Sequence, residues 1–200
     1  MAERYFTARR IAKLGIFSAL AVILYFLNFP LPFFPSFLEI HLSDLPALIC
    51  GFSMGPLGGF LVILVKILIK LPFSSTMCVG ELADLITGSA FVLPASFLYK
   101  NGRTRKSAVI GMLIGSLCSV ATAVVSNWLI IIPFYLNVMH VSIEALAEMC
   151  SSVIPFITAQ NFYACYIPLS VIPFNLLRCL IASLVTFFVY KRVSTLLKKF

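Results

Sequence analysis

The stretch LPALICGFSMGPLGGFLVILVKILIKL, residues 45–71, decides how the rest of the chain is interpreted. It carries no charge except two lysines, and it is longer than the roughly twenty helical residues that cross a bilayer once. Its centre, GPLGG at residues 55–59, favours a turn, because the residue before a proline is biased away from helical backbone. The sequence therefore predicts two helices here, a short one of residues 44–54 and a longer one of residues 57–71.

The composition predicts an integral membrane protein. With 61% hydrophobic and 11% charged residues among 200, a soluble domain would have too little polar surface to cover itself. The formal net charge of +8 is the excess of Lys and Arg expected in short cytoplasmic loops. Because no known nucleic-acid-binding module or aromatic-rich basic face accompanies this charge, nucleic acid is not an expected partner.

Most of the cations gather in three clusters, which report how the chain is oriented. The clusters are Arg4, Arg9, Arg10 and Lys13; Lys100, Arg103, Arg105 and Lys106; and Lys191, Arg192, Lys198 and Lys199. Such clusters flank spans on the cytoplasmic side. If residues 45–71 were one helix, three spans would place the first two clusters on opposite sides. Two helices in that stretch remove the conflict and give an even count.

The fold class predicted is an all-α integral membrane protein, a single transmembrane domain of residues 1–200 with six helices. The first apolar segment is too long for the core of a signal peptide and no small-residue cleavage site follows it, so it is expected to be retained. Both termini and the 100–106 loop are predicted to be cytoplasmic, and residues 138–170 to form an outer connection. The short second span must be shielded by neighbours or enter at an angle. The predicted spans are about 11–29, 44–54, 57–71, 81–99, 107–137 and 170–190.

Two polar residues begin the last span, within IPFNLLR at residues 172–178. Asn175 and Arg178 are three residues apart and share one helix face. An arginine on the outer side opposes the orientation bias of the clusters, although a side chain reaching the headgroups is the simpler alternative. We expect a ligand contact or a buried polar network.

A second polar group lies in the fifth span, where Asn127 precedes Trp128 in an otherwise apolar helix. An amide there either joins two helices or contacts a polar ligand. Its adjacent donor and acceptor suit the imide-like edge of a heterocycle.

The approach to the short second span, FLEIHLSDLP at residues 37–46, combines several polar residues. Ser43 or Asp44 is expected to cap that helix, with Pro46 in its first turn, and ligand contact is the alternative. Glu39 has no such structural role. The alternating pattern around it predicts an extended stretch that lines or covers a pocket.

Four charged residues bracket the turn between spans three and four. Lys66 and Lys70 lie one turn apart, and Glu81 and Asp84 follow on the next span. Opposite charges on adjacent antiparallel helices predict ion pairs near the outer surface. Lys70 is expected to extend to the headgroups, whereas Lys66 lies deeper and is a candidate site residue.

Small residues recur along the first span at spacings of three and four. They are Ala12, Gly15, Ser18 and Ala19. Such a stripe lets another helix approach closely, either within the bundle or from a partner protein.

The sequence contains little that indicates a catalytic or metal-binding site. Two histidines do not complete a hydrolytic triad, no metal-ligand spacing occurs, and no phosphate-binding loop is present, so ATP hydrolysis would need partner chains. No catalytic or metal-binding residue and no cofactor is predicted. The six cysteines have no CxxC spacing and are expected to be packing residues, with a disulfide among Cys78, Cys150 and Cys165 left open.

Four stretches together resemble the substrate-binding (S) components of energy-coupling factor (ECF) vitamin transporters, within them the riboflavin-specific type. They are FLEIHLSDLPALICGFSMGPLGG, VGELADLITGSAFVLPASFLYK, NWLIIIPFY and IPFNLLR, in the family's order and spread over nearly the whole chain. Gly15 and Ala19 also match the family's small-residue surface. The resemblance implies a six-helix protein of a prokaryotic cell membrane that binds riboflavin from outside, beneath the loop between spans one and two.

The same resemblance implies partners and site residues. A transmembrane coupling subunit, contacting the stripe of span one, and two ATPases would drive release inward. The resemblance implies ligand contacts from Asn127, Asn175, Arg178 and the loop around Leu38 to Leu42. With the candidates from the residue patterns above, the ligand-binding residues expected are Leu38, Glu39, Ile40, Asp44, Lys66, Asp84, Asn127, Asn175 and Arg178. Arg178 replaces a customary Lys and Asp84 a frequent Asn, and a planar guanidinium favours a phosphate, so FMN is an alternative ligand. Other vitamins, a small membrane enzyme centred on Lys66, Glu81 and Asp84, and a stand-alone channel also remain open.

Overall fold

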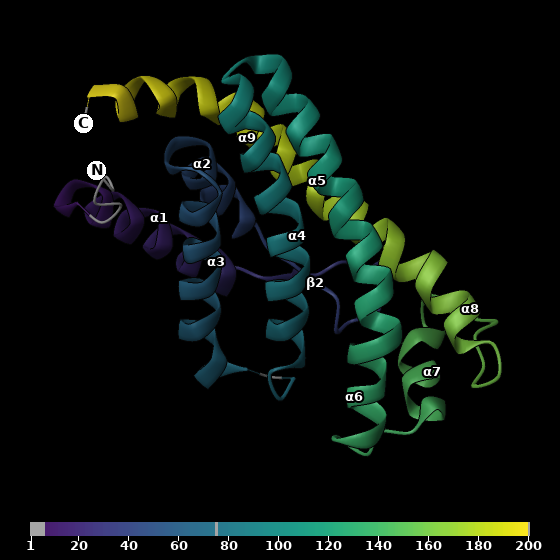
Figure 1. Cartoon of the computed structure of the whole chain (residues 1–200). Coiled ribbons are helices and arrows are strands. Elements are labelled where there is room, and N and C mark those ends of the chain that lie inside the picture. The colour runs from purple at the N-terminus through teal and green to yellow at the C-terminus, as the bar shows by residue number, and fades with distance from the viewer. Residues whose placement is uncertain (1–6, 75, 200) are drawn as a thin grey trace.

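The computed structural model describes residues 7–74 and 76–199, with side chains as far as residue 189, and this part of the chain is mostly helical (Figure 1). Arg4 lies outside the described residues, as do the side chains of Lys191, Arg192, Lys198 and Lys199. The helices are α1 (Ala8–Phe26), α2 (Asp44–Met54), α3 (Pro56–Lys70), α4 (Val79–Gly102), α5 (Arg105–Ser126), α6 (Ile132–Asn137), α7 (Ile143–Ser151), α8 (Phe162–Tyr166) and α9 (Ile172–Lys199).

The predicted break in residues 45–71 is confirmed. Helix α2 ends at Met54 and α3 begins at Pro56, where a proline has no amide proton to leave unpaired. Gly55 joins them with a φ of 92°, a backbone conformation that glycine adopts without steric cost. The Gly-Pro pair therefore separates the two helices as the sequence predicts.

The short helix α2 is buried in the middle of the bundle. It packs against α1, α3, α4 and α9, and its residues from Pro46 to Phe52 are all buried. An 11-residue helix is too short to span a bilayer by itself, and its neighbours supply the apolar surroundings that lipid would otherwise provide. The predicted shielding is confirmed.

Four continuous helical stretches among the described residues are long and apolar enough to cross a membrane. They are Pro56–Phe73, Val79–Gly102, Arg105–Asn137 and Phe162–Val189. Helix α2 is shorter, and the first two turns of α1 carry Arg9, Arg10 and Lys13, which lower its apolar character. The structure thus shows four such stretches, and the count of six spans stays a prediction.

Two π-helical turns keep the last two stretches continuous, and the second makes the last stretch longer than predicted. Asn127–Ile131 joins α5 to α6, and Ile167–Val171 joins α8 to α9. Pro168 lies inside the second of these turns, where the wider i→i+5 pattern accommodates it, so the helix begins at Phe162 rather than near residue 170. The predicted outer connection is correspondingly shorter, and it contains α7.

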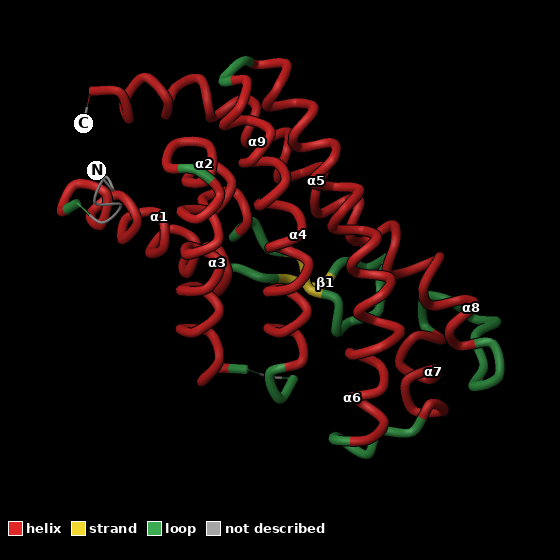
Figure 2. Tube along the Cα trace, viewed as in Figure 1, coloured by secondary structure: helices red, strands yellow, loops and turns green. Residues whose placement is uncertain are grey.

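Most connections lie at the ends of the bundle, but the one between α1 and α2 crosses its middle (Figure 2). This segment, residues 27–43, contains strands β1 (Phe29–Pro30) and β2 (Glu39–Ile40), which pair antiparallel. We call it the strap. The extended stretch predicted around Glu39 is confirmed.

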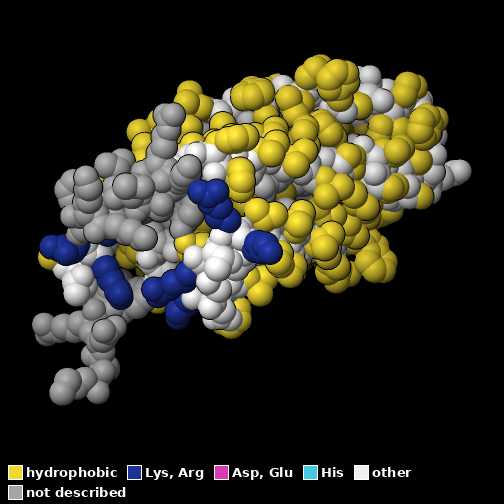
Figure 3. All heavy atoms as spheres, turned by 90° about the horizontal axis from the view of Figure 1, so that it is seen from above, with side chains coloured by type: hydrophobic (Ala, Val, Ile, Leu, Met, Phe, Trp, Pro, Cys, Tyr) yellow, Lys and Arg dark blue, Asp and Glu magenta, His cyan; other side chains and the backbone are white. Residues whose placement is uncertain are grey.

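Figure 3 shows one end of the molecule, where Lys and Arg side chains gather beside a hydrophobic flank. The α4–α5 turn lies at this end, near the start of α1 and the end of α9 (Figure 1). Lys100, Arg103, Arg105 and Lys106 are all exposed there. The two described cation clusters therefore share one end of the bundle, as the count of spans required.

The pairing of α4 with α5 is the most extensive helix contact, and glycines make it close. A Cβ atom at Gly115 would lie 2.4 Å from the Phe91 carbonyl oxygen, and one at Gly111 would lie 2.7 Å from that of Ala95. Neither carbonyl can move without breaking the helix. These two positions set the interhelical distance.

Substituting Gly115→Ala should lower the free energy of unfolding by about 1–3 kcal/mol, because the added methyl forces α4 and α5 apart. Thermal unfolding of purified protein in detergent measures the effect. The matched control is Gly15→Ala on α1, where an added Cβ meets nothing within 4 Å. Equal behaviour of the two variants would contradict the proposed close approach.

Candidate ligand-binding site

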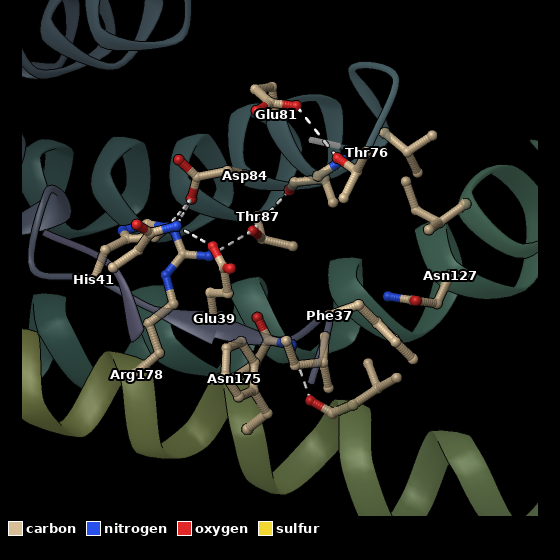
Figure 4. Close-up of a pocket in the computed structure, with 18 of the residues that line it drawn as sticks. Phe37, Glu39, His41, Thr76, Glu81, Asp84, Thr87, Asn127, Asn175 and Arg178 are labelled. Atoms are coloured by element: carbon tan, nitrogen blue, oxygen red, sulfur yellow. Dashed lines mark hydrogen bonds and ion pairs between the residues drawn. The ribbon is translucent and has the colours of Figure 1, made fainter. Parts of the chain in front are cut away.

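A cavity of about 420 Å³ opens between the strap, α4, the π-turn after α5, and α9 (Figure 4). Its walls combine apolar and aromatic surface with many polar and charged side chains. The volume lies within the range of small-molecule sites in proteins. The residues that line it include Tyr25, Phe37, Leu38, Glu39, His41, Lys70, Glu81, Asp84, Thr87, Asn127, Tyr135, Tyr166, Phe174, Asn175 and Arg178.

Four charged residues form a buried cluster at one side of this cavity. The Lys66 ammonium lies 2.8 Å from Asp44 Oδ1 and 2.9 Å from Asp84 Oδ2. Arg178 reaches the same two carboxylates from α9, with Nη2 2.5 Å from Asp44 Oδ2 and also paired with Asp84 Oδ1. The side chains of all four are at most 8% exposed. Two cations and two anions cancel, which makes their burial tolerable.

This ion cluster ties four helices together, because each member comes from a different one. Asp44 starts α2, Lys66 is on α3, Asp84 on α4 and Arg178 on α9. The predicted pairing of spans three and four is therefore confirmed for Lys66 with Asp84. Glu81 instead accepts a hydrogen bond of 2.7 Å from Ser74, and the Lys70 ammonium lies 4.3 Å from the centre of the Phe26 ring.

His41 joins the ion cluster through a neighbouring serine. Lys66 Nζ donates to Ser43 Oγ at 2.6 Å, and Ser43 Oγ lies 3.0 Å from His41 Nδ1. His41 Nε2 faces the Asp84 carboxylate at 3.6 Å, which favours the ring proton on Nε2, so Nδ1 accepts from the Ser43 hydroxyl. Ser43 precedes α2 as predicted, but its side chain makes no capping hydrogen bond because it is engaged here.

The His41 ring lies in the strap, outside the helices, and is kept neutral. Burial lowers its pKa from 6.5 to about 4, the nearby Arg178 and Lys66 act in the same direction, and Asp84 acts against them. A neutral ring is what the hydrogen bond from Ser43 requires.

Arg178 has little capacity left for a ligand. Its Nε donates to Asp44 at 2.9 Å, its Nη2 donates to both Asp44 and Asp84, and its Nη1 donates to Thr87 at 3.2 Å. These are four of the five N–H groups of a guanidinium. Arg178 lines the cavity, yet within the described residues its main role is to hold the two aspartates.

Two amides face the cavity with their orientation fixed by their own helices. Asn127 donates to the Ala123 carbonyl at 2.9 Å, and Asn175 donates to the Val171 carbonyl at 2.8 Å. Each side chain keeps its carbonyl oxygen and one N–H for another partner. Asn127 starts one π-turn and Asn175 follows the other, and π-turns are frequent at functional sites.

The structure separates the predicted ligand-binding residues into two groups. Leu38, Glu39, Asp84, Asn127, Asn175 and Arg178 line the cavity. Ile40 is buried in the β-pair opposite Phe29, and Asp44 and Lys66 lie behind the wall in the ion cluster. The last two act on the cavity through Arg178 and Asp84, so they are positioning residues.

Several lining residues were not predicted to contact a ligand. His41 and Glu81 are in the wall, and so are Thr87 and the aromatic rings of Tyr135 and Tyr166. For His41 and Glu81 the sequence did contain an indication of a functional role, because a histidine or a glutamate within an apolar segment is costly to bury. Aromatic residues gave none, because they are common throughout this chain.

The small-residue stripe of α1 is mostly accessible. Ala12, Gly15 and Ala19 are exposed, whereas Ser18 is buried within the chain at 5% exposure. The accessible part of the stripe is therefore three residues. The six cysteines are all free thiols, so the disulfide left open among Cys78, Cys150 and Cys165 does not form.

Most of the chain is similar to known membrane proteins. Residues 9–190 match the profile of the family described as ECF transporter, substrate-specific component. The riboflavin transporter RibU of Staphylococcus aureus is 30% identical over 191 residues, covering 96% of this chain and 93% of that protein. The riboflavin transporter FmnP of Bacillus subtilis is 31% identical over 135 residues, 66% of this chain and 71% of that protein.

A solved structure of the S component of a bacterial ECF transporter has the same fold. It aligns with a TM-score of 0.74 and 29% identity, and the alignment covers 95% of this chain and 98% of the other. The relatives are transporter components rather than enzymes.

Removing one cation from the ion cluster should be strongly destabilising. Lys66→Met leaves Asp44 and Asp84 with Arg178 alone, and an uncompensated buried charge costs about 3–5 kcal/mol. The double variant Lys66→Met/Asp44→Asn restores neutrality and should recover part of the loss. Unfolding in detergent measures both, with Lys70→Met as the control one turn away. A single variant as stable as the double would contradict the charge balance.

The neutral His41 predicts a pH dependence of stability. Its pKa is about 4 in the folded protein and near 6.5 when unfolded, so the unfolded chain binds the extra proton between those values. Stability should therefore fall as the pH drops from about 6.5 toward 4. Midpoints of thermal unfolding at four pH values measure this, and His41→Gln should flatten the slope. The exposed His140→Gln is the control, and parallel curves for wild type and His41→Gln would refute the assignment.

Proposed function

The chain belongs to the family of ECF transporter substrate-specific components, and from that premise we propose that it is the riboflavin-binding subunit of such a transporter. It captures the vitamin in the cavity under the strap and presents it for release on the other side of the membrane. The observation that carries the choice of ligand is the cavity itself, with aromatic walls and two oriented amides.

The chemistry of the cavity fits a flat, uncharged heterocycle with a polar edge and a hydroxylated chain. Tyr135, Tyr166 and Phe174 supply faces against which a fused ring system packs. The free carbonyl and N–H of Asn127 and of Asn175 match an edge that alternates acceptors with a donor, as in a flavin. Glu39 supplies acceptor oxygens for hydroxyl groups.

Membrane orientation follows from the position of the charges. We propose six spans, with α1 and α2 added to the four long apolar stretches, and both termini cytoplasmic. The end of the bundle that carries the cation clusters then faces the cytoplasm, and the strap faces outward. The cavity opens on the side from which a vitamin arrives, in the cell membrane of a prokaryote.

Transport in this family involves further chains. We propose that a transmembrane coupling subunit binds the accessible stripe of Ala12, Gly15 and Ala19, where small side chains let two helices approach closely. Two ATPase subunits supply the energy, because the sequence has no phosphate-binding loop of its own. The protein has no cofactor in this scheme, since riboflavin is the cargo.

Replacing Asn175 or Asn127 by Ala should weaken riboflavin binding by about 1–3 kcal/mol, or roughly 5- to 150-fold, because a buried ligand group loses its partner. Quenching of riboflavin fluorescence by purified protein gives the dissociation constants. The control is Asn101→Ala, an exposed amide at the end of α4.

The wild-type protein tests the function directly. It should quench riboflavin fluorescence at nanomolar concentrations or carry flavin absorbance through purification. No binding in detergent and none in lipid vesicles would refute riboflavin as the ligand. Unchanged affinity in both asparagine variants would remove these amides from the site.

A further inference from the structure

We propose that two carboxylates in the cavity wall, Glu39 and Glu81, restrict this site to uncharged flavins and exclude their phosphate esters. The inference rests on the proposed function and adds the charge of the ligand as a selected property. It reverses the expectation that the arginine at position 178 favours a phosphate.

The first step is that the ion cluster offers no free positive charge. Asp44 and Asp84 neutralise Lys66 and Arg178, and four of the five N–H groups of Arg178 are already used. The one remaining N–H belongs to a cluster whose net charge is zero, and bidentate binding of a phosphate would separate Arg178 from a buried carboxylate. The released aspartate would then face the phosphate without a cation of its own, so the exchange of partners would not stabilise the complex.

The second step is that Glu81 presents a carboxylate without a cationic partner. It is 4% exposed, and it is held by hydrogen bonds from the hydroxyls of Ser74 at 2.7 Å and Thr76 at 3.5 Å. Within the described residues, no Lys, Arg or His nitrogen lies within 4.0 Å of it. The negative charge of Glu81 therefore contributes to the electrostatic potential in the cavity.

Glu39 adds a second carboxylate from the strap. It accepts a hydrogen bond from Asn28, and among the described residues it too has no ion-pair partner. Figure 4 shows Glu81 on α4 and Glu39 on the strand of the strap, so the two approach the cavity from different elements. A ligand in the cavity meets negative charge from both.

One cation of the wall lies outside the ion cluster, and it does not reverse the balance. The Lys70 ammonium is 4.3 Å from the centre of the Phe26 ring and 5.5 Å from that of Tyr25. Counting Glu39 and Glu81 against Lys70 leaves the wall at −1, because the cluster itself sums to zero. Lys70 is also drawn toward the aromatic rings, which stabilise a cation there.

A phosphate ester carries a charge of about −1.5 to −2 at pH 7. Salt screens exposed charges over about 8 Å, but it acts less on a buried charge such as that of Glu81, so the repulsion persists at the wall. Hydroxyl groups of an uncharged ligand, in contrast, donate hydrogen bonds to the same carboxylates. One pair of residues thus favours the free vitamin and opposes its phosphate.

The test compares dissociation constants of riboflavin and FMN, measured by fluorescence quenching on the purified full-length protein. Wild type is expected to bind FMN at least about tenfold more weakly than riboflavin at pH 7.5. Glu81→Gln and Glu39→Gln should each reduce this ratio about three- to tenfold, because glutamine keeps an acceptor oxygen but loses the charge. The exposed Glu144→Gln on α7, away from the cavity, should leave the ratio unchanged.

A measurement on wild type alone keeps the proposal testable if a variant fails to fold. The second phosphate proton has a pKa of about 6, so the ratio should fall when the pH is lowered to 5.5. FMN binding as tight as riboflavin binding overturns the proposal, as does a ratio that is unchanged by pH or by both substitutions. Loss of all flavin binding in wild type would instead refute the proposed function.

Discussion

The fold depends on charge neutrality at one buried point. Two aspartates and two cations from four different helices meet where each side chain is at most 8% exposed. A single unpaired charge there would cost several kcal/mol, so the four helices must arrive together for any of them to be stable. The ion cluster thereby joins the start of α2 to α3, α4 and α9.

The same constraint shapes the binding site. Because Arg178 and Asp84 neutralise each other in the wall, they define its position without attracting a charged ligand. Recognition is then left to groups whose hydrogen-bonding capacity is only partly used, namely the amides of Asn127 and Asn175 and the carboxylates of Glu39 and Glu81. A site of this kind is suited to a ligand that is polar at its edges and uncharged overall.

Two π-turns in the long helices lie beside the amides of the binding site. The π-turns at Asn127–Ile131 and Ile167–Val171 let long helices continue past Pro133 and Pro168 while they redirect the side chains that follow. The predicted fifth span, residues 107–137, already ran through Pro133. The last span was predicted to begin only after Pro168, because nothing in the sequence marks a wider turn that accommodates a proline, so the start of the helix at Phe162 was missed.

Local chemistry was readable from the sequence alone. The break at Gly55, the extended stretch at Glu39 and the pairing of Lys66 with Asp84 each depend on neighbouring residues or on adjacent antiparallel helices. The spacing of Asn175 and Arg178 placed both on one face. Only the tertiary structure decided what that face meets, because Asp44 lies 134 positions away along the chain from Arg178. Contacts between distant helices change a predicted ligand contact into a structural one, and no local pattern records them.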